Sequence, residues 1–192
     1  MRALVLASTS PYRRALLARL ALPFDVVAPG VSEADVADEP PPLRAERLAL
    51  AKAQAVAHQY PEALILGSDQ VAALDGRVLH KSGHAARCRE QLTALSGKSA
   101  TFHTACALIG AGARINLAHL DVTTVVFRSL ASAEIERYIE REQPFDCAGS
   151  FKAESLGISL FERIDSSDPT ALLGLPLIWV ARALRSCGYA LP

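Results

Sequence analysis

Two kinds of apolar pattern alternate along this chain of 192 residues. Short continuous apolar runs, such as Ala3–Ala7 and Ala63–Leu66, are typical of buried strands. Between them lie segments with helical spacing of apolar residues, of which the alanine-rich Leu43–Gln59 is the longest. This order predicts a mixed α/β fold. The chain has no internal repeat or low-complexity linker, so we expect one domain over residues 1–192.

Turn and cap residues set the element boundaries. Ser10-Pro11 predicts an N-cap with proline at the first helical position, opening a helix to Leu20. Asp75-Gly76 predicts a two-residue hairpin turn. After this turn we expect a helix over Ala85–Leu95 and an antiparallel strand pair, Ala100–Ile109 and Arg114–Phe127, around Gly110–Gly112. A helix over Ala133–Glu142 should follow. The last helix is expected to run from Asp168 to Arg185 and to bend at Gly174–Pro176.

Composition excludes several classes of protein. Lys+Arg and Asp+Glu both number 20, and this balance argues against a protein that coats nucleic acid or a membrane surface. No apolar run approaches the roughly 20 residues of a membrane span. The stretch Met1–Ala7 is too short for a signal peptide, so we expect no nucleic-acid or membrane partner and a cytoplasmic location. The scattered cysteines are expected as reduced thiols: Cys88, Cys106, Cys147 and Cys187.

The strand–turn–helix at Leu6–Arg13 is a candidate anion site. A helix N-terminus presents unpaired N–H groups, and Ser8, Ser10 and Arg13 surround this one. The guanidinium of Arg13 can fork onto phosphate oxygens. The plain alternative is that Ser10 only caps the helix while Arg13 lies in solvent.

Asp69 and Lys52 are candidates for catalysis and anion binding. Asp69 directly follows the apolar run Ala63–Leu66 and Gly67-Ser68, where α/β sheets place ligands, and it can hold a metal or accept a proton. It could instead be an ordinary turn aspartate. On a helical wheel Lys52 faces inward, where an ammonium needs an anionic partner unless its stem carries it to the surface.

Two further positions have weaker support. Lys81 would be returned towards Asp69 by the Asp75-Gly76 turn, and Glu33 could complete a metal site, although it could equally be a solvated loop carboxylate. Lys152 and Glu154 would share one face of an extended segment after the core residue Phe151, where an exposed ion pair is the alternative.

Together these segments resemble the Maf family of nucleoside triphosphate pyrophosphatases. They occur in the family's order and span nearly the whole chain. The matching stretches are Leu6–Arg14, Leu50–Ala53, Gly67–Val71, Ala148–Glu154 and Gly174–Pro176.

The resemblance implies a Maf- and ITPase-like α/β fold, with a mixed twisted sheet, flanking helices and two lobes around a deep cleft. It also implies a homodimer that cleaves a nucleoside triphosphate to monophosphate and pyrophosphate with Mg²⁺ or Mn²⁺. The implied roles are Asp69 as proton acceptor and metal ligand, Glu33 beside the metal, and phosphate binding by Ser8, Arg13, Lys52 and Lys81, with Lys152 a further candidate.

The substrate branch follows from three positions. Tyr12, Gln70 and Glu154 match positions tied to base choice, and Ser68-Asp69-Gln70 looks like the Maf branch that hydrolyses 7-methyl-GTP. A carboxylate can accept guanine N–H groups, and an aromatic face attracts a cationic methylated base. A pyrophosphatase for dTTP, UTP or other modified nucleotides, and a nucleotide-binding regulator of cell division without catalysis, are the alternatives.

The chain departs from the family pattern at two places. His80-Lys81-Ser82 stands where the family often has Gly-Lys-Pro, so we expect a less rigid loop around the lysine. Ser155 stands where glycine is common, and it would be strained if the backbone there needs positive φ.

Overall fold

The computed structural model describes residues 2–110 and 115–192. The expected turn Gly110–Gly112 and the residue Arg114 fall largely outside these ranges. The strands are β1 (Leu4–Ala7), β2 (Asp25–Val27), β3 (Leu64–Leu74), β4 (Arg77–Leu79), β5 (Ser99–Gly110), β6 (Ile115–Phe127) and β7 (Phe161–Asp165). The helices are α1 (Pro11–Ala18), α2 (Pro41–Ala57), α3 (Ala85–Leu95), α4 (Ser132–Glu142) and α5 (Leu177–Ser186), with short 3-10 helices η1 (Leu156–Leu160) and η2 (Ala171–Leu173).

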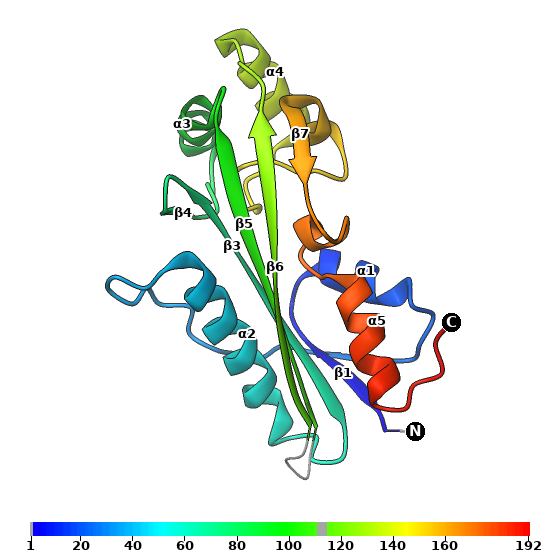
Figure 1. Cartoon of the computed structure of the whole chain (residues 1–192). Coiled ribbons are helices and arrows are strands. Elements are labelled where there is room, and N and C mark those ends of the chain that lie inside the picture. Colours follow the sequence, from blue (N-terminus) through cyan, green and yellow to red (C-terminus); the bar gives the residue numbers. More distant parts are fainter. Residues whose placement is uncertain (1, 111–114) are drawn as a thin grey trace.

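The strands form one mixed sheet in the order β2-β1-β3-β5-β6-β7, with β4 paired to β3. The pairs β1–β2 and β1–β3 are parallel, whereas β3–β4, β3–β5, β5–β6 and β6–β7 are antiparallel. The long strands β3, β5 and β6 run through the length of the molecule (Figure 1). The expected mixed α/β sheet with flanking helices is therefore confirmed.

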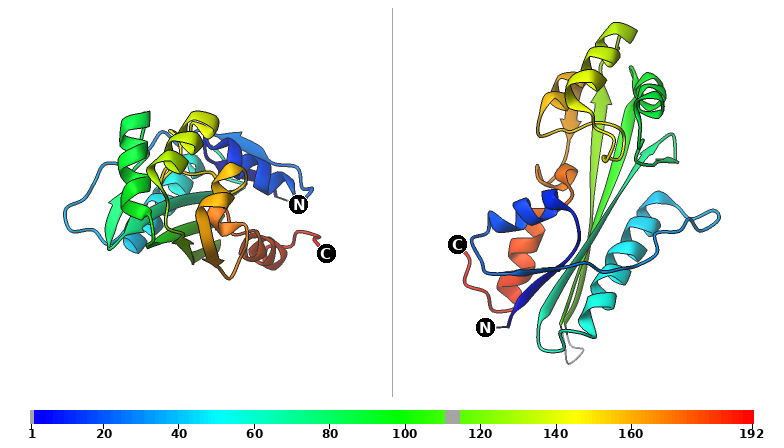
Figure 2. Two further views of the ribbon diagram at one scale, coloured as in Figure 1. Left: turned by 90° about the horizontal axis from the view of Figure 1, so that it is seen from above. Right: turned by 180° about the vertical axis from the view of Figure 1, so that it is seen from behind.

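The helices gather at the two ends of these long strands and form two lobes. At one end α2 covers one face of the sheet while α1 and α5 cover the other (Figures 1 and 2). Alternation along β3 explains this, because Leu64 and Leu66 pack with α1 and α5 while Ile65 packs with α2. At the other end α3 and α4 pack around Phe102 and Phe127. The two-lobed arrangement expected from the resemblance is confirmed.

Several local predictions hold. Ser10 caps α1 by accepting a hydrogen bond from Arg13 N at 3.3 Å, with Pro11 in the first turn. The hairpin between β3 and β4 turns at Asp75 and Gly76, whose φ values of 50° and 78° are both positive. The cysteines form no disulfide, since all are free. No helix in the described part of the chain is long and apolar enough to cross a membrane.

Three predictions are wrong. Asp69 does not follow a strand; it lies in the middle of β3, which β5 pairs along its whole length. The segment from Asp168 to Arg185 is not one bent helix, because Gly174 has a φ of 107° and separates η2 from α5. Residues 152–155 are a turn that enters η1 rather than an extended segment.

Candidate active site

Strand β3 changes its neighbour on one edge near the centre of the molecule. That edge pairs with β1 over Leu64–Gly67 and with β4 over Ala72–Leu74. Between these two stretches, no strand among residues 2–110 and 115–192 pairs with Ser68–Val71 on this side. Here β1 ends and leads into the turn before α1. The sheet edge is therefore open where the chain carries Asp69 and Gln70.

A cavity of about 730 Å³ lies at this opening. Its volume is within the range of about 300–1,000 Å³ that small-molecule sites usually have. All of the predicted site residues except Lys152 line it. They are Ser8, Tyr12, Arg13, Glu33, Lys52, Asp69, Gln70, Lys81 and Glu154.

The turn before α1 forms one wall of the cavity. Ser8 is buried, and its Oγ accepts a hydrogen bond from Ser10 N at 3.1 Å, which shapes the turn. Arg13 does not lie free in solvent, because its Nε donates to the carbonyl oxygen of Gly174 at 2.9 Å. The N-terminal end of α1 and the guanidinium of Arg13 thus face the same space.

Lys52 on α2 meets two carboxylates inside the cavity. It is 6% exposed, and its Nζ lies 2.6 Å from Asp69 Oδ1 and 2.6 Å from Glu33 Oε1. The prediction that Lys52 points inward to an anionic partner is confirmed. Gly67 makes this close approach of α2 to β3 possible, since a Cβ there would lie 2.2 Å from the carbonyl oxygen of Ala49.

The two carboxylates differ in proton affinity. Burial raises the pKa of Asp69 even though Lys52 and Arg13 oppose it. Burial also favours the protonated form of Glu33, but the hydrogen bond and charge of Lys52, with the charges of Lys81 and Arg13, leave its pKa below the usual value. Of the pair, Asp69 therefore holds a proton more readily than Glu33 does.

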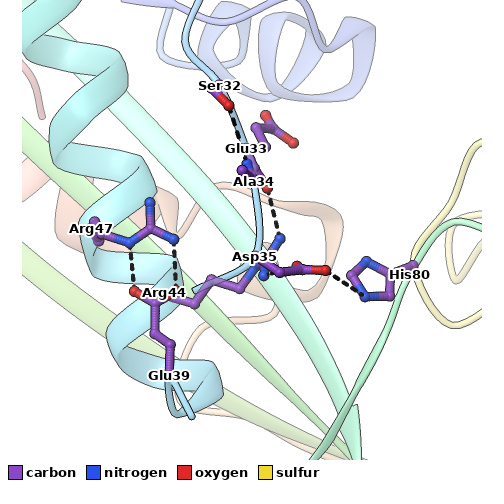
Figure 3. A network of polar contacts seen from close by, with 8 residues as sticks. All are labelled: Ser32, Glu33, Ala34, Asp35, Glu39, Arg44, Arg47 and His80. Atoms are coloured by element: carbon purple, nitrogen blue, oxygen red, sulfur yellow. Dashed lines mark hydrogen bonds and ion pairs between the residues drawn. The ribbon is translucent and has the colours of Figure 1, made fainter. Parts of the chain in front are cut away.

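A polar network holds the loop that carries Glu33 (Figure 3). Arg44 on α2 donates from Nη2 to the carbonyl oxygen of Glu33 at 2.9 Å and pairs through Nη1 with Asp35. The other carboxylate oxygen of Asp35 lies 3.9 Å from His80 Nε2, just before Lys81. Farther along the loop, Arg47 of α2 forks onto Glu39.

The segment around Lys81 is anchored despite its departure from the family pattern. Lys81 forms a β-bridge with Ala148, and the carbonyl oxygen of His80 accepts from Gln91 Nε2 at 2.8 Å. Gly83 N donates to the carbonyl oxygen of Phe145 at 2.9 Å. These contacts tie the segment to its neighbours, and the lower rigidity expected from His80 and Ser82 stays a prediction.

Aromatic and acidic side chains meet where the first turn of α1 approaches residues 146 and 147. The hydroxyl of Tyr12 donates to Asp146 Oδ2 at 3.5 Å, and the Cys147 thiol lies 3.9 Å from it. Burial raises the pKa of Tyr12, and the neighbouring Cys147, Asp146 and Glu154 raise it further, so the phenol stays neutral. Glu154 is exposed on the same side of the cavity.

Gln70 and Ser68 point to the face of β3 opposite Asp69. The Gln70 amide nitrogen lies 2.9 Å from Thr104 Oγ1 and 3.0 Å from the carbonyl oxygens of Ala171 and Leu172. Ser68 Oγ donates to the carbonyl oxygen of Gly174 at 3.0 Å. Both side chains therefore tie β3 to the loop between η2 and α5.

Lys152 is not brought together with the other predicted cations. Its Nζ donates to the carbonyl oxygen of Glu142 at 3.2 Å and lies 3.7 Å from the carboxylate of that residue. The turn at 152–155 directs it there, away from the cavity wall formed by Glu154. Ser155 has a φ of −135°, so the strain expected of a non-glycine residue does not arise.

Four residues support the site through contacts that sequence reasoning did not predict. Ser68 and Gly174 lie in matching stretches and Asp146 does not, but each acts through a residue far away in the chain. Arg44 could have been found, since it lies two helical repeats before Lys52 on the same predicted face.

The family model described as Maf-like protein matches residues 3–187. The chain belongs to the Maf family. Its Maf motifs converge in space: the first forms the turn before α1, the second lies on α2, and the third lies in β3. The remaining two form the wall beside Tyr12 and the Gly174 loop that anchors Arg13.

Close relatives cover the full length. A protein of Xanthomonas axonopodis pv. citri (strain 306) named 7-methyl-GTP pyrophosphatase is 54% identical over 192 residues, all of both chains. A protein of the same name from Polaromonas sp. is 51% identical over 190 residues, 99% of this chain and 87% of that one. The solved Ham1 protein of Staphylococcus aureus is 14% identical, with a TM-score of 0.46, and the match covers 66% of this chain and 72% of that one.

Proposed function

We propose that this chain hydrolyses 7-methyl-GTP to 7-methyl-GMP and pyrophosphate with a divalent cation. The main support is one cavity that joins three cations, Arg13, Lys52 and Lys81, with the carboxylates of Glu33 and Asp69. Membership of the Maf family and full-length relatives named 7-methyl-GTP pyrophosphatase agree with this proposal.

The cationic wall is suited to the triphosphate. Repulsion by the phosphate charges opposes attack of water, and Arg13, Lys52 and Lys81 would spread that charge as it develops. The hydroxyl of Ser8 would donate a hydrogen bond to a phosphate oxygen, and the positive end of the α1 dipole would favour the phosphate charge. Lys52 would exchange part of its contact with the two carboxylates for a phosphate oxygen.

Asp69 would accept the proton of the attacking water. The oxygen of that water bonds to the α-phosphorus, the bond from the α-phosphorus to the bridging oxygen breaks, and pyrophosphate leaves. The raised pKa of Asp69, caused by burial, supports the role of proton acceptor. Lys52 beside it would keep the carboxylate oriented towards the phosphates.

Asp69 and Glu33 are the pair that would hold the divalent cation. Their carboxylate oxygens already converge on one positive charge, Lys52 Nζ, at 2.6 Å each. Three or more His, Cys, Asp or Glu side chains do not cluster as a metal site anywhere in residues 2–110 and 115–192. Mg²⁺ commonly takes one or two carboxylates together with substrate phosphates and waters, so this pair fits it. The bound cation would supply charge neutralisation and polarise phosphoryl oxygens.

The acidic and aromatic wall is suited to the base. Methylation at N7 makes guanine cationic, and the ring of Tyr12 with the carboxylates of Glu154 and Asp146 offers an attractive surface for such a base. Glu154 can accept hydrogen bonds from guanine N–H groups. Gln70 would act through its oxygen, since its nitrogen is engaged with Thr104 and η2.

A pyrophosphate-release assay tests the reaction and the substrate together. The full chain with Mg²⁺ should release pyrophosphate from 7-methyl-GTP faster than from GTP, dTTP or UTP, and excess chelator should abolish release. Asp69→Asn should lower turnover by about 10² to 10⁴ with the fold intact by circular dichroism. Glu154→Gln should reduce the preference for 7-methyl-GTP over GTP.

The outcomes separate the alternatives. A preference for dTTP or UTP would contradict the substrate while leaving the reaction in place. Nucleotide binding without pyrophosphate release would instead support a regulator without catalysis. Near-normal turnover of Asp69→Asn would contradict the assignment of the proton acceptor.

A further inference from the structure

Arg44 is a buried cation of the cavity to which the proposed reaction assigns no role. It is 9% exposed and lies on the same stripe of α2 as Leu48 and Lys52, at intervals of four residues. Unlike Lys52, it forms no hydrogen bond or ion pair with Asp69 or another side chain of β3 in the described chain. All of its hydrogen bonds in the described chain go to the loop that carries Glu33.

Helix α2 therefore holds Glu33 both by its backbone and by its carboxylate. Arg44 Nη2 donates to the backbone carbonyl of Glu33 at 2.9 Å, and Lys52 Nζ lies 2.6 Å from its carboxylate. Both donors project from one rigid helix, so their separation is set by the helix rise of about 1.5 Å per residue. Figure 3 shows Arg44 reaching across from α2 to the loop at Glu33 and Asp35.

The Glu33 side chain needs this support because it lies on a loop and is 57% exposed. In the described structure, Lys52 is the only ion-pair partner of the Glu33 carboxylate. When Lys52 turns towards a phosphate, the carboxylate loses this partner. A free loop carboxylate would then have to be ordered at an entropic cost before it could hold a cation beside Asp69. The hydrogen bond from Arg44 to the Glu33 backbone does not depend on Lys52.

We propose that Arg44 is a positioning residue for the divalent cation: it fixes the backbone of Glu33 so that the Glu33 carboxylate stays beside Asp69. This inference rests on the proposed function, in which Glu33 and Asp69 hold the cation. Asp35 assists by pairing with the other nitrogen of the guanidinium, and His80 contacts Asp35 from the opposite side at 3.9 Å.

The test measures Mn²⁺ affinity in the full chain. Binding of Mn²⁺ alone is followed by electron paramagnetic resonance, and the Mn²⁺ dependence of pyrophosphate release from 7-methyl-GTP is measured separately. Arg44→Gln should weaken Mn²⁺ binding by roughly 10- to 100-fold, as expected for a residue that orients a metal ligand. Turnover at saturating Mn²⁺ should stay within a few-fold of wild type. The Mn²⁺ affinity of Arg44→Lys should fall between those of wild type and Arg44→Gln, since lysine keeps the charge and one donor nitrogen.

Arg47→Gln is the matched control. Arg47 lies on the same helix and holds the same loop through Glu39, but it does not contact Glu33. Its loss should leave Mn²⁺ binding unchanged. Equal weakening by Arg44→Gln and Arg47→Gln would mean that loosening the loop in general causes the loss, and it would overturn the inference.

Double substitution shows whether Arg44 acts through Glu33. Arg44→Gln in a Glu33→Gln background should weaken Mn²⁺ binding no further than Glu33→Gln alone, whereas an additive loss would overturn the inference. If Arg44→Gln fails to fold by circular dichroism, Arg44→Lys decides by the same criteria. Unchanged Mn²⁺ binding by the Arg44 variants, with wild-type activity normal, contradicts this inference alone. A wild-type chain that binds Mn²⁺ but hydrolyses no nucleotide contradicts the proposed function alone.

Discussion

The carbonyl oxygen of Gly174 anchors two residues from different parts of the chain. It accepts from Arg13 Nε at 2.9 Å and from Ser68 Oγ at 3.0 Å. Gly174 has a φ of 107°, which side-chain-bearing residues rarely adopt. A Cβ at this position would also lie 3.3 Å from Arg13 Nε. One residue without a side chain thus sets the place of a proposed phosphate-binding guanidinium.

Gly174→Ala should lower both stability and turnover. The strained backbone should cost roughly 1–3 kcal/mol of unfolding free energy, and displacement of Arg13 should raise KM for the nucleotide. Gly188→Ala is the control, because Gly188 has a φ of 91° but no atom within 4 Å of the added Cβ. Urea unfolding and pyrophosphate release of both variants test this. Equal loss of activity in both would contradict a specific role for Gly174.

At the scale of elements, the start of α5 is capped by side chains that lie several residues before it in the sequence, Asp168 and Thr170. Asp168 is buried, and its Oδ2 accepts from Ile178 N at 2.7 Å while its Oδ1 accepts from Thr170 N at 2.8 Å. Leu177 N donates to Thr170 Oγ1 at 2.9 Å. The cap closes the loop that contains Gly174, so it links the start of α5 to the cavity wall.

Asp168→Ala should remove the side-chain acceptor of Thr170 N and Ile178 N and destabilise the chain by about 1–2 kcal/mol, as loss of a helix cap does. Asp165→Ala is the control, since the exposed Asp165 pairs only with Arg163 on the same strand, and its loss should change stability little. Urea unfolding monitored by circular dichroism measures both. A similar small effect of the two substitutions would show that the cap contributes little.

At the scale of the whole molecule, the two lobes share strands β3, β5 and β6 (Figure 1). Phe102 of β5 packs in the core with α3 and α4, while Leu108 of the same strand packs in the core with α1 and α5. Separate unfolding of one lobe would break strands that the other needs. We therefore retain the proposal that residues 1–192 form one domain. The homodimer implied by the Maf resemblance stays a prediction, which analytical ultracentrifugation tests.

A single domain should unfold in one transition. Trp179, the single tryptophan, lies in the core of α1 and α5 and reports one lobe by fluorescence. Far-UV circular dichroism reports the helices of both lobes. The two probes should give the same urea midpoint. Different midpoints would indicate lobes that unfold independently.

Local sequence determined much of this protein. Ser10-Pro11, Asp75-Gly76 and the periodicity of Ala85–Leu95 predicted a cap, a turn and a helix that the structure contains, because each depends on neighbouring residues alone. The inward face of Lys52 followed in the same way from helical spacing. The Maf motifs also contain about half of the residues that line the cavity.

Tertiary structure decided the rest. Asp69 lies within a long strand because β5 pairs with β3 throughout, and the site opens there because β1 and β4 leave one edge of β3 unpaired. Other tertiary contacts join Lys152 to Glu142 and Arg44 to Glu33. Hydrogen bonds between segments distant in sequence leave no periodic pattern in either segment, so only the folded chain determines them.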